Sequence, residues 1–262
     1  MNAVLTMVTG FLRDVGYQLE LVAQVVVRLG GVLRRRTLIS DQLFQSGLKV
    51  VHVVLLVGVF IGMIVALQTG LELANFGQQD QIGTIVALSM CREMGPFITA
   101  TILAATVGSA LAAEIGTMAV SEELAALEVM SIDRISYLVM PRVVGVAVMC
   151  PLLTVLCDAI GIFGGGLIAG SQLNVGAALY YDSVLDALND RGLPFELPKE
   201  VYTGLFKALV FGVILSVISC SAGIKATAGA MGVGNATRKA VRDSIIAIII
   251  CNYFLSWLFF NA

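Results

Sequence analysis

The amino-acid sequence predicts an all-α integral membrane protein with a single membrane domain over residues 1–262. The chain is 58% hydrophobic. Only 13% of its residues are charged, whereas soluble domains carry about 25%. The apolar residues also occur in long blocks, which leave no room for a separate water-soluble domain. Together these observations indicate a chain that lies largely within lipid.

Five apolar stretches are long enough to cross a bilayer, because a spanning helix needs about 20 mostly apolar residues. Their limits are set by the points at which charges and turn residues return. The third stretch is longer than a bilayer requires, and Pro151 within it predicts a kink. The stretches are 48–71, 82–110, 138–170, 203–222 and 244–260, which form a predicted transmembrane bundle over 48–260.

The N-terminal residues 1–35 are predicted to form an amphipathic helix at the inner membrane surface. Apolar side chains repeat there at helical spacing, whereas charged and polar side chains take the other faces. A first, imperfect spanning helix is the alternative, and it would reverse the location of one terminus. The repeating apolar residues are Leu12, Val15, Leu19, Val22, Val26 and Leu29.

The distribution of Lys and Arg predicts the orientation of the helices. Most of the 16 basic residues lie in three stretches, whereas the link 72–81 contains none. The basic stretches and the N-terminus are therefore expected to be cytoplasmic, with the C-terminus outside. The acidic link 171–202 is also expected outside, and Pro194 and Pro198 predict a short helix followed by a turn. The basic stretches are 28–49, 111–142 and 223–243.

Two adjacent charges, Arg92 and Glu93, lie in the middle of the second apolar stretch. An ionisable residue at that depth costs at least about 2.5 to 3.5 kcal/mol on insertion scales, so such residues usually mark a functional site. Helical neighbours point about 100° apart, so each charge needs a partner elsewhere. Pro96 cannot donate a hydrogen bond to the carbonyl of Arg92, which predicts a kinked helix with exposed backbone there. A buried ion pair that only fixes helix packing is the alternative.

Lys207 is a third charge within an apolar stretch. It either shares a cavity with Glu93 or extends to the membrane interface. A cavity with apolar walls and a few charges suits an amphiphile better than an ion or a sugar.

The link 112–142 carries acidic residues among apolar residues at helical spacing. This pattern predicts a helix that is too polar to span and must dock, either on its own membrane domain or in a groove of a soluble partner. The chain lacks the phosphate-binding motif G-x-x-x-x-G-K-[ST]. Any ATP hydrolysis must therefore come from a partner.

Several motifs in one order resemble the MlaE family of ABC-transporter permeases, the membrane subunits of bacterial lipid transporters. They include "REMGP" at 92–96, "GSALAAEIGTM" at 108–118 and "EELAALEVMSID" at 122–133, and the resemblance runs from about residue 48 to the C-terminus. It implies an inner-membrane permease that moves phospholipid between the membrane and a periplasmic MCE carrier, driven by ATP. Such a system maintains outer-membrane lipid asymmetry.

The resemblance also implies partners and site residues. The expected partners are a second copy of the chain, a cytoplasmic ABC ATPase that binds ATP and Mg, a periplasmic MCE-domain protein and phospholipid, while a small cytoplasmic accessory subunit is left open. No cofactor, metal ligand or catalytic residue is expected in the chain, and its net charge of -2 argues against binding nucleic acid. The implied substrate-binding residues are Arg92, Glu93, Lys207, Val65, Leu73 and Phe76, and the implied ATPase-coupling residues are Glu122, Glu123, Leu124 and Leu127.

The sequence departs from the family pattern in three places. Ala105 and Thr106 stand where the family usually has Gly-Arg, Arg134 stands where Pro is frequent, and Asn252 stands where Asp is usual. These departures are expected to alter the charge network around the coupling helix without changing the fold.

Two other functions are compatible with a membrane chain of this kind. A proton-coupled secondary transporter of an amphiphilic substrate would use Glu93 or Asp158 as its proton site, but it predicts inverted repeats, and the sequence shows no convincing pair. A non-transporting scaffold would make the intramembrane charges incidental.

Overall fold

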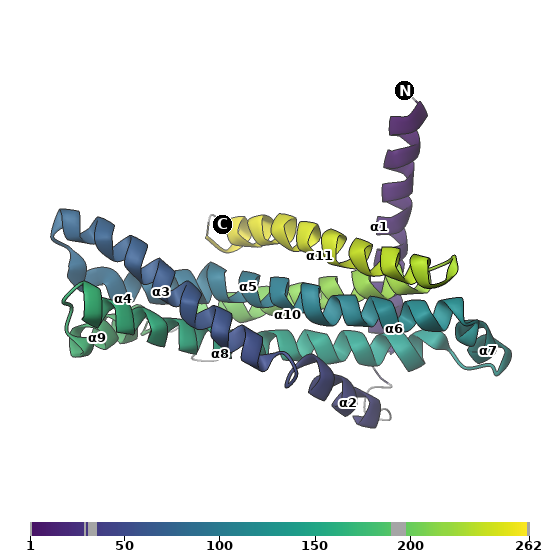
Figure 1. The fold of residues 1–262 in the computed structure, drawn as a ribbon, viewed down its shortest axis with the longest axis horizontal. Helices are drawn as coiled ribbons and strands as arrows, with labels where there is room; N and C mark the ends of the chain where they lie inside the picture. Colours follow the sequence, from purple (N-terminus) through teal and green to yellow (C-terminus); the bar gives the residue numbers. More distant parts are fainter. Residues whose placement is uncertain (1, 29, 31–35, 190–197, 261–262) are drawn as a thin grey trace. The chain divides into compact units, whose positions relative to one another are not determined.

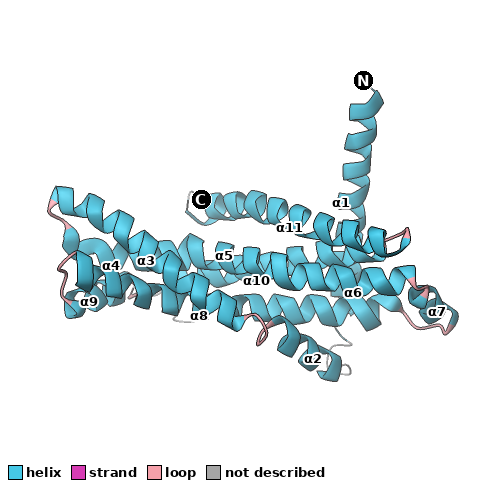
Figure 2. Cartoon of the chain, viewed as in Figure 1, coloured by secondary structure: helices cyan, strands magenta, loops and turns pink. Residues whose placement is uncertain are grey.

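The computed structural model describes residues 2–28, 30, 36–189 and 198–260 (Figure 1). Figure 2 shows that this part of the chain consists of helices joined by loops and turns, with no strand among the described residues. The predicted all-α class is therefore confirmed. Leu29 and Pro194, which enter the predictions above, lie outside the described residues.

Within the described part of the chain, five helical segments are long and apolar enough to cross a membrane, which is the predicted number. The N-terminal helix α1 is not one of the five, and its predicted place at the membrane surface stays a prediction. The largest difference from the predicted limits is at the last segment, which begins at Gly229 instead of residue 244. The five segments are Val51–Phe76, Gln79–Val120, Ile135–Gln172, Lys199–Ile224 and Gly229–Phe259.

Three of these segments are single helices, whereas the second and third are interrupted. The interruptions η3, η4 and η5 are single π-helical turns, a feature that is rare and frequent at functional sites. In chain order the elements are α1 (Asn2–Arg28), α2 (Arg36–Ser46), α3 (Val51–Phe76), η2 (Gln79–Gln81), α4 (Ile82–Ser89), η3 (Met90–Met94), α5 (Gly95–Leu103), η4 (Ala104–Gly108), α6 (Ser109–Val120), α7 (Glu123–Val129), η5 (Ile135–Val139), α8 (Met140–Gln172), α9 (Ala177–Ala187), α10 (Lys199–Ile224) and α11 (Gly229–Phe260).

The chain forms two compact units, which are described separately. The long helices α8, α10 and α11 each contribute residues to both units. The prediction of one membrane domain stays a prediction. The first unit comprises residues 1–46, 103–147 and 212–248, and the second comprises 47–102, 148–211 and 249–262.

In the first unit, α1 is the predicted amphipathic helix, but only part of its apolar surface is packed. Leu21 and Val25 are buried in a core formed with residues of α6, α7, η5, α8 and α10. On another face Leu12, Leu19 and Val26 are 61%, 64% and 57% exposed. This exposed apolar face needs a cover that the unit does not supply, which supports the predicted contact with lipid.

The prediction of one helix over 112–142 is wrong. Helix α6 ends before Glu122, whose φ of 63° lies in the left-handed region, as does the φ of 58° at Ser131. Between these breaks lies only the short helix α7. The carboxylate of Asp133 then accepts the backbone N–H of Ile135 at 3.1 Å. This contact is typical of a helix N-cap and starts the next helical segment.

In the second unit, α4 packs against α9, the short helix predicted in the link 171–202 (Figure 1). Tyr180 of α9 is fully buried, and its hydroxyl donates to the carbonyl of Ile162 at 2.9 Å. Thr84 of α4 donates to the carbonyl of Ser183 at 3.1 Å. Helix α9 is thus an integral part of this unit.

Candidate functional site

Four charged side chains of the second unit form two ion pairs. Glu93 Oε1 lies 2.6 Å from Lys207 Nζ. Arg92 binds Glu200 through two hydrogen bonds, one from Nε to Oε2 and one from Nη2 to Oε1 at 2.7 Å. The prediction that each of the adjacent charges needs a partner elsewhere is confirmed. These four residues, together with Asn252 and Ser256, are called the charged cluster below.

The backbone at Arg92 has the opening that Pro96 predicts. The N–H of Gly95 donates to the carbonyl of Met90, five residues back, which defines the π-helical turn η3. Pro96 has no N–H to offer to the carbonyl of Arg92. That carbonyl accepts a hydrogen bond from Lys207 Nζ at 3.0 Å. The irregular backbone is therefore stabilised by a side chain from α10.

Lys207 is the most deeply buried member of the charged cluster. Its side chain is 0% exposed, so it does not extend to the membrane interface as the alternative proposes. An ammonium group has three protons to donate. Three acceptors lie within reach: Glu93 Oε1, the Arg92 carbonyl, and Ser256 Oγ at 2.8 Å. Lys207 thus joins η3, α10 and α11 at one point.

Helix α11 supplies the neutral members of the charged cluster. Asn252 Nδ2 donates to Glu93 Oε2 at 3.0 Å, and Ser256 Oγ lies 2.7 Å from Glu93 Oε1. An Asp at position 252 would place a second carboxylate against Glu93, whereas Asn supplies a donor and leaves the cluster with two acidic and two basic groups. Asn252 thus belongs to the charged cluster, and the expected effect of the departures on a network around the coupling helix stays a prediction.

The close approach of α10 to η3 depends on Gly204. This glycine lies between Glu200 and Lys207, and a Cβ atom built on it would overlap the carbonyl oxygen of Cys91. A larger side chain would hold both ion-pairing residues away from their partners. Gly204 is therefore part of the construction of the charged cluster.

Sequence analysis missed Glu200 and Ser256 as members of the charged cluster. Glu200 and Lys207 are seven residues apart, about two helical turns, so they share one face of α10. Asn252 and Ser256 are four apart and share a face of α11. This spacing was the available signal, but spacing alone does not show which helix a face meets.

Three predicted apolar lining residues lie on α3, which contributes no residue to the charged cluster. Val65 and Leu73 are half-buried, and Phe76 is 75% exposed. Their role in binding a substrate stays a prediction.

The predicted coupling residues divide into two groups. Leu124 is buried and Leu127 half-buried against the core of the first unit, which supports docking on the chain's own domain for these two residues. Glu122 and Glu123 are exposed, as is Val129 at 86%. Only this second group offers a surface to another protein.

Comparison with known proteins gives a consistent result. A family model described as Permease MlaE matches residues 39–258. A probable ABC transporter permease protein of Synechocystis is 41% identical over 232 residues, which is 88% of this chain and 84% of the relative. The intermembrane phospholipid transport system permease protein MlaE of Haemophilus influenzae is 30% identical over 86% of this chain and 84% of its own length. The chloroplastic protein TRIGALACTOSYLDIACYLGLYCEROL 1 of Arabidopsis thaliana is 38% identical over 91% of this chain and 66% of its own length.

Proposed function

Because this multi-pass membrane chain belongs to the MlaE family of ABC-transporter permeases, we propose that it moves phospholipid between the inner membrane and a periplasmic MCE-domain carrier. In this proposal two copies of the chain enclose the lipid, and transport maintains outer-membrane lipid asymmetry. The Haemophilus influenzae relative is named as a phospholipid transport permease, which supports phospholipid as the substrate. The N-terminus is cytoplasmic and the C-terminus periplasmic, as the basic residues predict.

The observation that carries the proposal is the difference in access between the two basic groups of the charged cluster. The Arg92 side chain is 36% exposed, whereas that of Lys207 is 0% exposed. A guanidinium fork binds phosphate oxygens in a bidentate way, as it binds the carboxylate of Glu200 here. We therefore assign Arg92 to the lipid headgroup and Lys207 to holding η3, α10 and α11 together.

ATP hydrolysis in this proposal belongs to a separate ATPase that binds ATP and Mg. Its contact on this chain is the exposed acidic surface at Glu122 and Glu123. Movement of α7 reaches the membrane helices through Leu124 and Leu127, which pack on the core of the first unit. In this proposal Glu122 and Glu123 contact the ATPase, and Leu124 and Leu127 transmit its movement to the membrane helices.

The test is purification of the full chain in mild detergent from cells that co-express its genomic neighbours, with bound proteins and lipids identified by mass spectrometry. Arg92→Gln should lower the amount of bound phospholipid and leave the ATPase bound, because Arg92 belongs to the second unit and the coupling residues Glu122 and Glu123 belong to the first. Glu122→Lys with Glu123→Lys should release the ATPase, whereas the matched control Glu72→Lys should not. A chain that carries neither ATPase nor phospholipid would overturn the proposal.

One observation favours the proton-coupled transporter as a second candidate. Asp158 is 8% exposed, and its Oδ1 has no hydrogen-bond partner among the described residues. A Cβ atom built on Gly95 would overlap this carboxyl group, so Asp158 lies directly against the helix that follows η3. Buried intramembrane carboxyl groups of this kind act as proton relays in transporters. Asp158→Asn should abolish transport under this candidate and leave ATP-driven transport intact under the first.

A further inference from the structure

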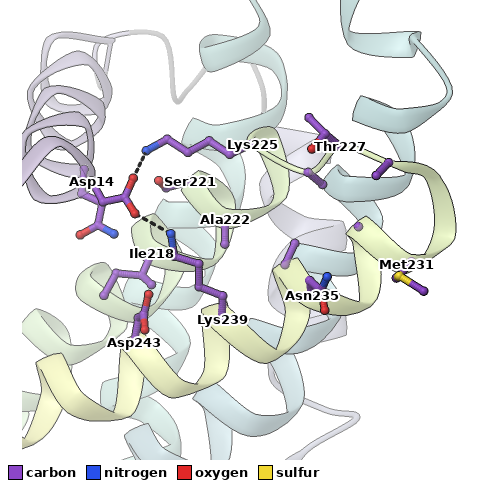
Figure 3. Close-up of a pocket in the computed structure, with 15 residues that line it drawn as sticks. Asp14, Ile218, Ser221, Ala222, Lys225, Thr227, Met231, Asn235, Lys239 and Asp243 are labelled. Atoms are coloured by element: carbon purple, nitrogen blue, oxygen red, sulfur yellow. Dashed lines mark hydrogen bonds and ion pairs between the residues drawn. The ribbon is translucent and has the colours of Figure 1, made fainter. Parts of the chain in front are cut away.

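The first unit contains a cavity of about 300 Å³ at the junction of three helices. It is lined by residues of α1, the end of α10, the connecting turn and the first turns of α11 (Figure 3). Helices α10 and α11 are both candidate membrane spans, and only four residues, 225–228, separate them. The cavity therefore lies where two spans end, which is the level of lipid headgroups.

An ion-pair triad crosses this cavity. Asp14 of α1 lies between Lys225 and Lys239, as the dashed lines in Figure 3 show. The distances are 2.6 Å from Asp14 Oδ1 to Lys225 Nζ and 2.5 Å from Asp14 Oδ2 to Lys239 Nζ. The chain's own carboxylate thus occupies a position that two ammonium groups converge on.

The triad is accessible enough to exchange partners. The side chains of Asp14, Lys225 and Lys239 are 31%, 36% and 43% exposed. Ion pairs at such exposure contribute little to stability, because water and salt compete for each charge. An oxyanion that enters the cavity can therefore replace the Asp14 carboxylate as the ion-pair partner of Lys225 and Lys239.

The charges of the lining are balanced, which decides the kind of ligand. Lys225 and Lys239 are matched by two carboxylates, Asp14 and Asp243. Asp243 also pairs with Arg242, whose Nε lies 2.9 Å from Asp243 Oδ1. A singly anionic headgroup at the lysines would leave the displaced Asp14 carboxylate unpaired, whereas a zwitterion can place its phosphate at the lysines and its ammonium group at the aspartates.

The remaining lining is partly apolar, which distinguishes a lipid from a free phosphate compound. Ile218, Ala222 and Met231 line the cavity, and Met231 is 78% exposed. Acyl chains can cover such surfaces, whereas a soluble phosphate cannot.

We infer that this cavity binds the headgroup of a zwitterionic, amine-bearing phospholipid, whose phosphate replaces the Asp14 carboxylate between Lys225 and Lys239 while its ammonium group pairs with Asp14 and Asp243. The site is separate from the charged cluster and requires neither transport nor an ATPase. It would hold even if the proposed transport function failed.

The experiment is zero-length carbodiimide cross-linking of the purified full-length chain in detergent, followed by peptide mass spectrometry. The reagent activates a carboxylate, and a neighbouring amine displaces the urea to form an amide. Without lipid, Asp14 should be joined to Lys225 or Lys239. With phosphatidylethanolamine, this internal link should be lost, and the lipid amine should instead be attached to Asp14 or Asp243.

Two further ligands identify the source and charge of the bound group. Phosphatidylglycerol, which is anionic and has no amine, should leave the internal link in place. Glycerophosphoethanolamine at equal concentration should also leave it in place, because it lacks acyl chains. Equal loss of the link with either compound would overturn the assignment to a zwitterionic lipid, and persistence of the link in phosphatidylethanolamine would overturn the site itself.

Variants test the role of the lysines. Lys225→Gln with Lys239→Gln should abolish the lipid adduct at Asp14 and Asp243, whereas Lys49→Gln, an exposed lysine outside the cavity, should retain it. An adduct that persists in the double variant would overturn the role of the lysines. If the double variant does not fold, the comparison of the three ligands on the unmodified chain still decides the proposal.

Discussion

The charged cluster and the ion-pair triad each join three elements through lysines and carboxylates, but they differ in access to solvent. Lys207 and Glu200 of the charged cluster have side chains that are 0% and 8% exposed, whereas all three members of the triad are at least 31% exposed. Breaking a buried pair leaves a charge that nothing else can satisfy, whereas water satisfies an exposed one. Lys207 and Glu200 therefore fix a structure, and access to the charged cluster is limited to Arg92 and Glu93 at 36% and 33% exposure. Every member of the triad is accessible and can exchange with a ligand.

The largest effect is expected from Lys207→Met. This change leaves Glu93 without its cation and the Arg92 carbonyl without its donor. Removing one partner of a buried pair costs roughly 3 to 5 kcal/mol, and the exposure of Glu93 should place this variant at the lower end of that range. The measurement is the thermal midpoint of the purified full-length chain, followed by fluorescence-detected size-exclusion chromatography.

The control for this prediction is the removal of both charges. Lys207→Met combined with Glu93→Gln should recover much of the lost stability, because no unpaired charge remains. Lys199→Met, at an exposed lysine in the first turn of α10, should have little effect. A double variant no more stable than Lys207→Met would contradict the role assigned to the pair.

The contrast between the two regions also explains what sequence analysis could recover. The need of Arg92 and Glu93 for distant partners follows from helix geometry alone, as does the lack of a helical N–H from Pro96 for the Arg92 carbonyl. The identity of Glu200 as a partner does not, because it depends on which face of α10 meets η3. That choice is set by contacts such as the one at Gly204 between segments more than 100 residues apart.

The link 112–142, which contains the predicted coupling residues, shows a second limit of sequence patterns. Helical spacing of apolar residues over 112–142 continues through positions where the backbone breaks. The left-handed conformation of Glu122 and Ser131 has no signature in residue type, since neither is glycine. Asp133 was the one sign in the sequence that a new helical segment begins there, because Asp is a preferred N-cap residue.

A smaller effect is expected from Gly204→Ala. The added Cβ atom would overlap the Cys91 carbonyl oxygen, so α10 must shift away from η3. Overpacking of this kind costs typically about 1 to 3 kcal/mol. Gly234→Ala in α11 is the matched control, because a Cβ atom there meets nothing within 4 Å. Thermal midpoints that fall equally in both variants would show that helix approach at Gly204 is not the cause.

The smallest effect is expected at the ion-pair triad and depends on pH. Hydrogen bonds from Lys225 and then from Lys239 lower the pKa of Asp14 below its usual value. A carboxyl group with a lowered pKa in the folded state contributes stability above its unfolded pKa of about 3.9 and loses that contribution as the pH falls through the folded value. The contribution of Asp14, about 1 kcal/mol or less, should therefore be constant at neutral and mildly acidic pH. It should disappear only in strong acid.

The measurement is the difference in thermal midpoint between the unmodified chain and Asp14→Asn, taken at each pH so that effects common to both chains cancel. Glu20→Gln, on the same helix but outside the cavity, should show no such difference at any pH. A difference that already vanishes in mild acid would mean that Asp14 is not held ionised by the two lysines. In that case an entering phosphate would displace a carboxylate that the lysines hold only weakly, and the triad would differ from the buried pair at Lys207 even more.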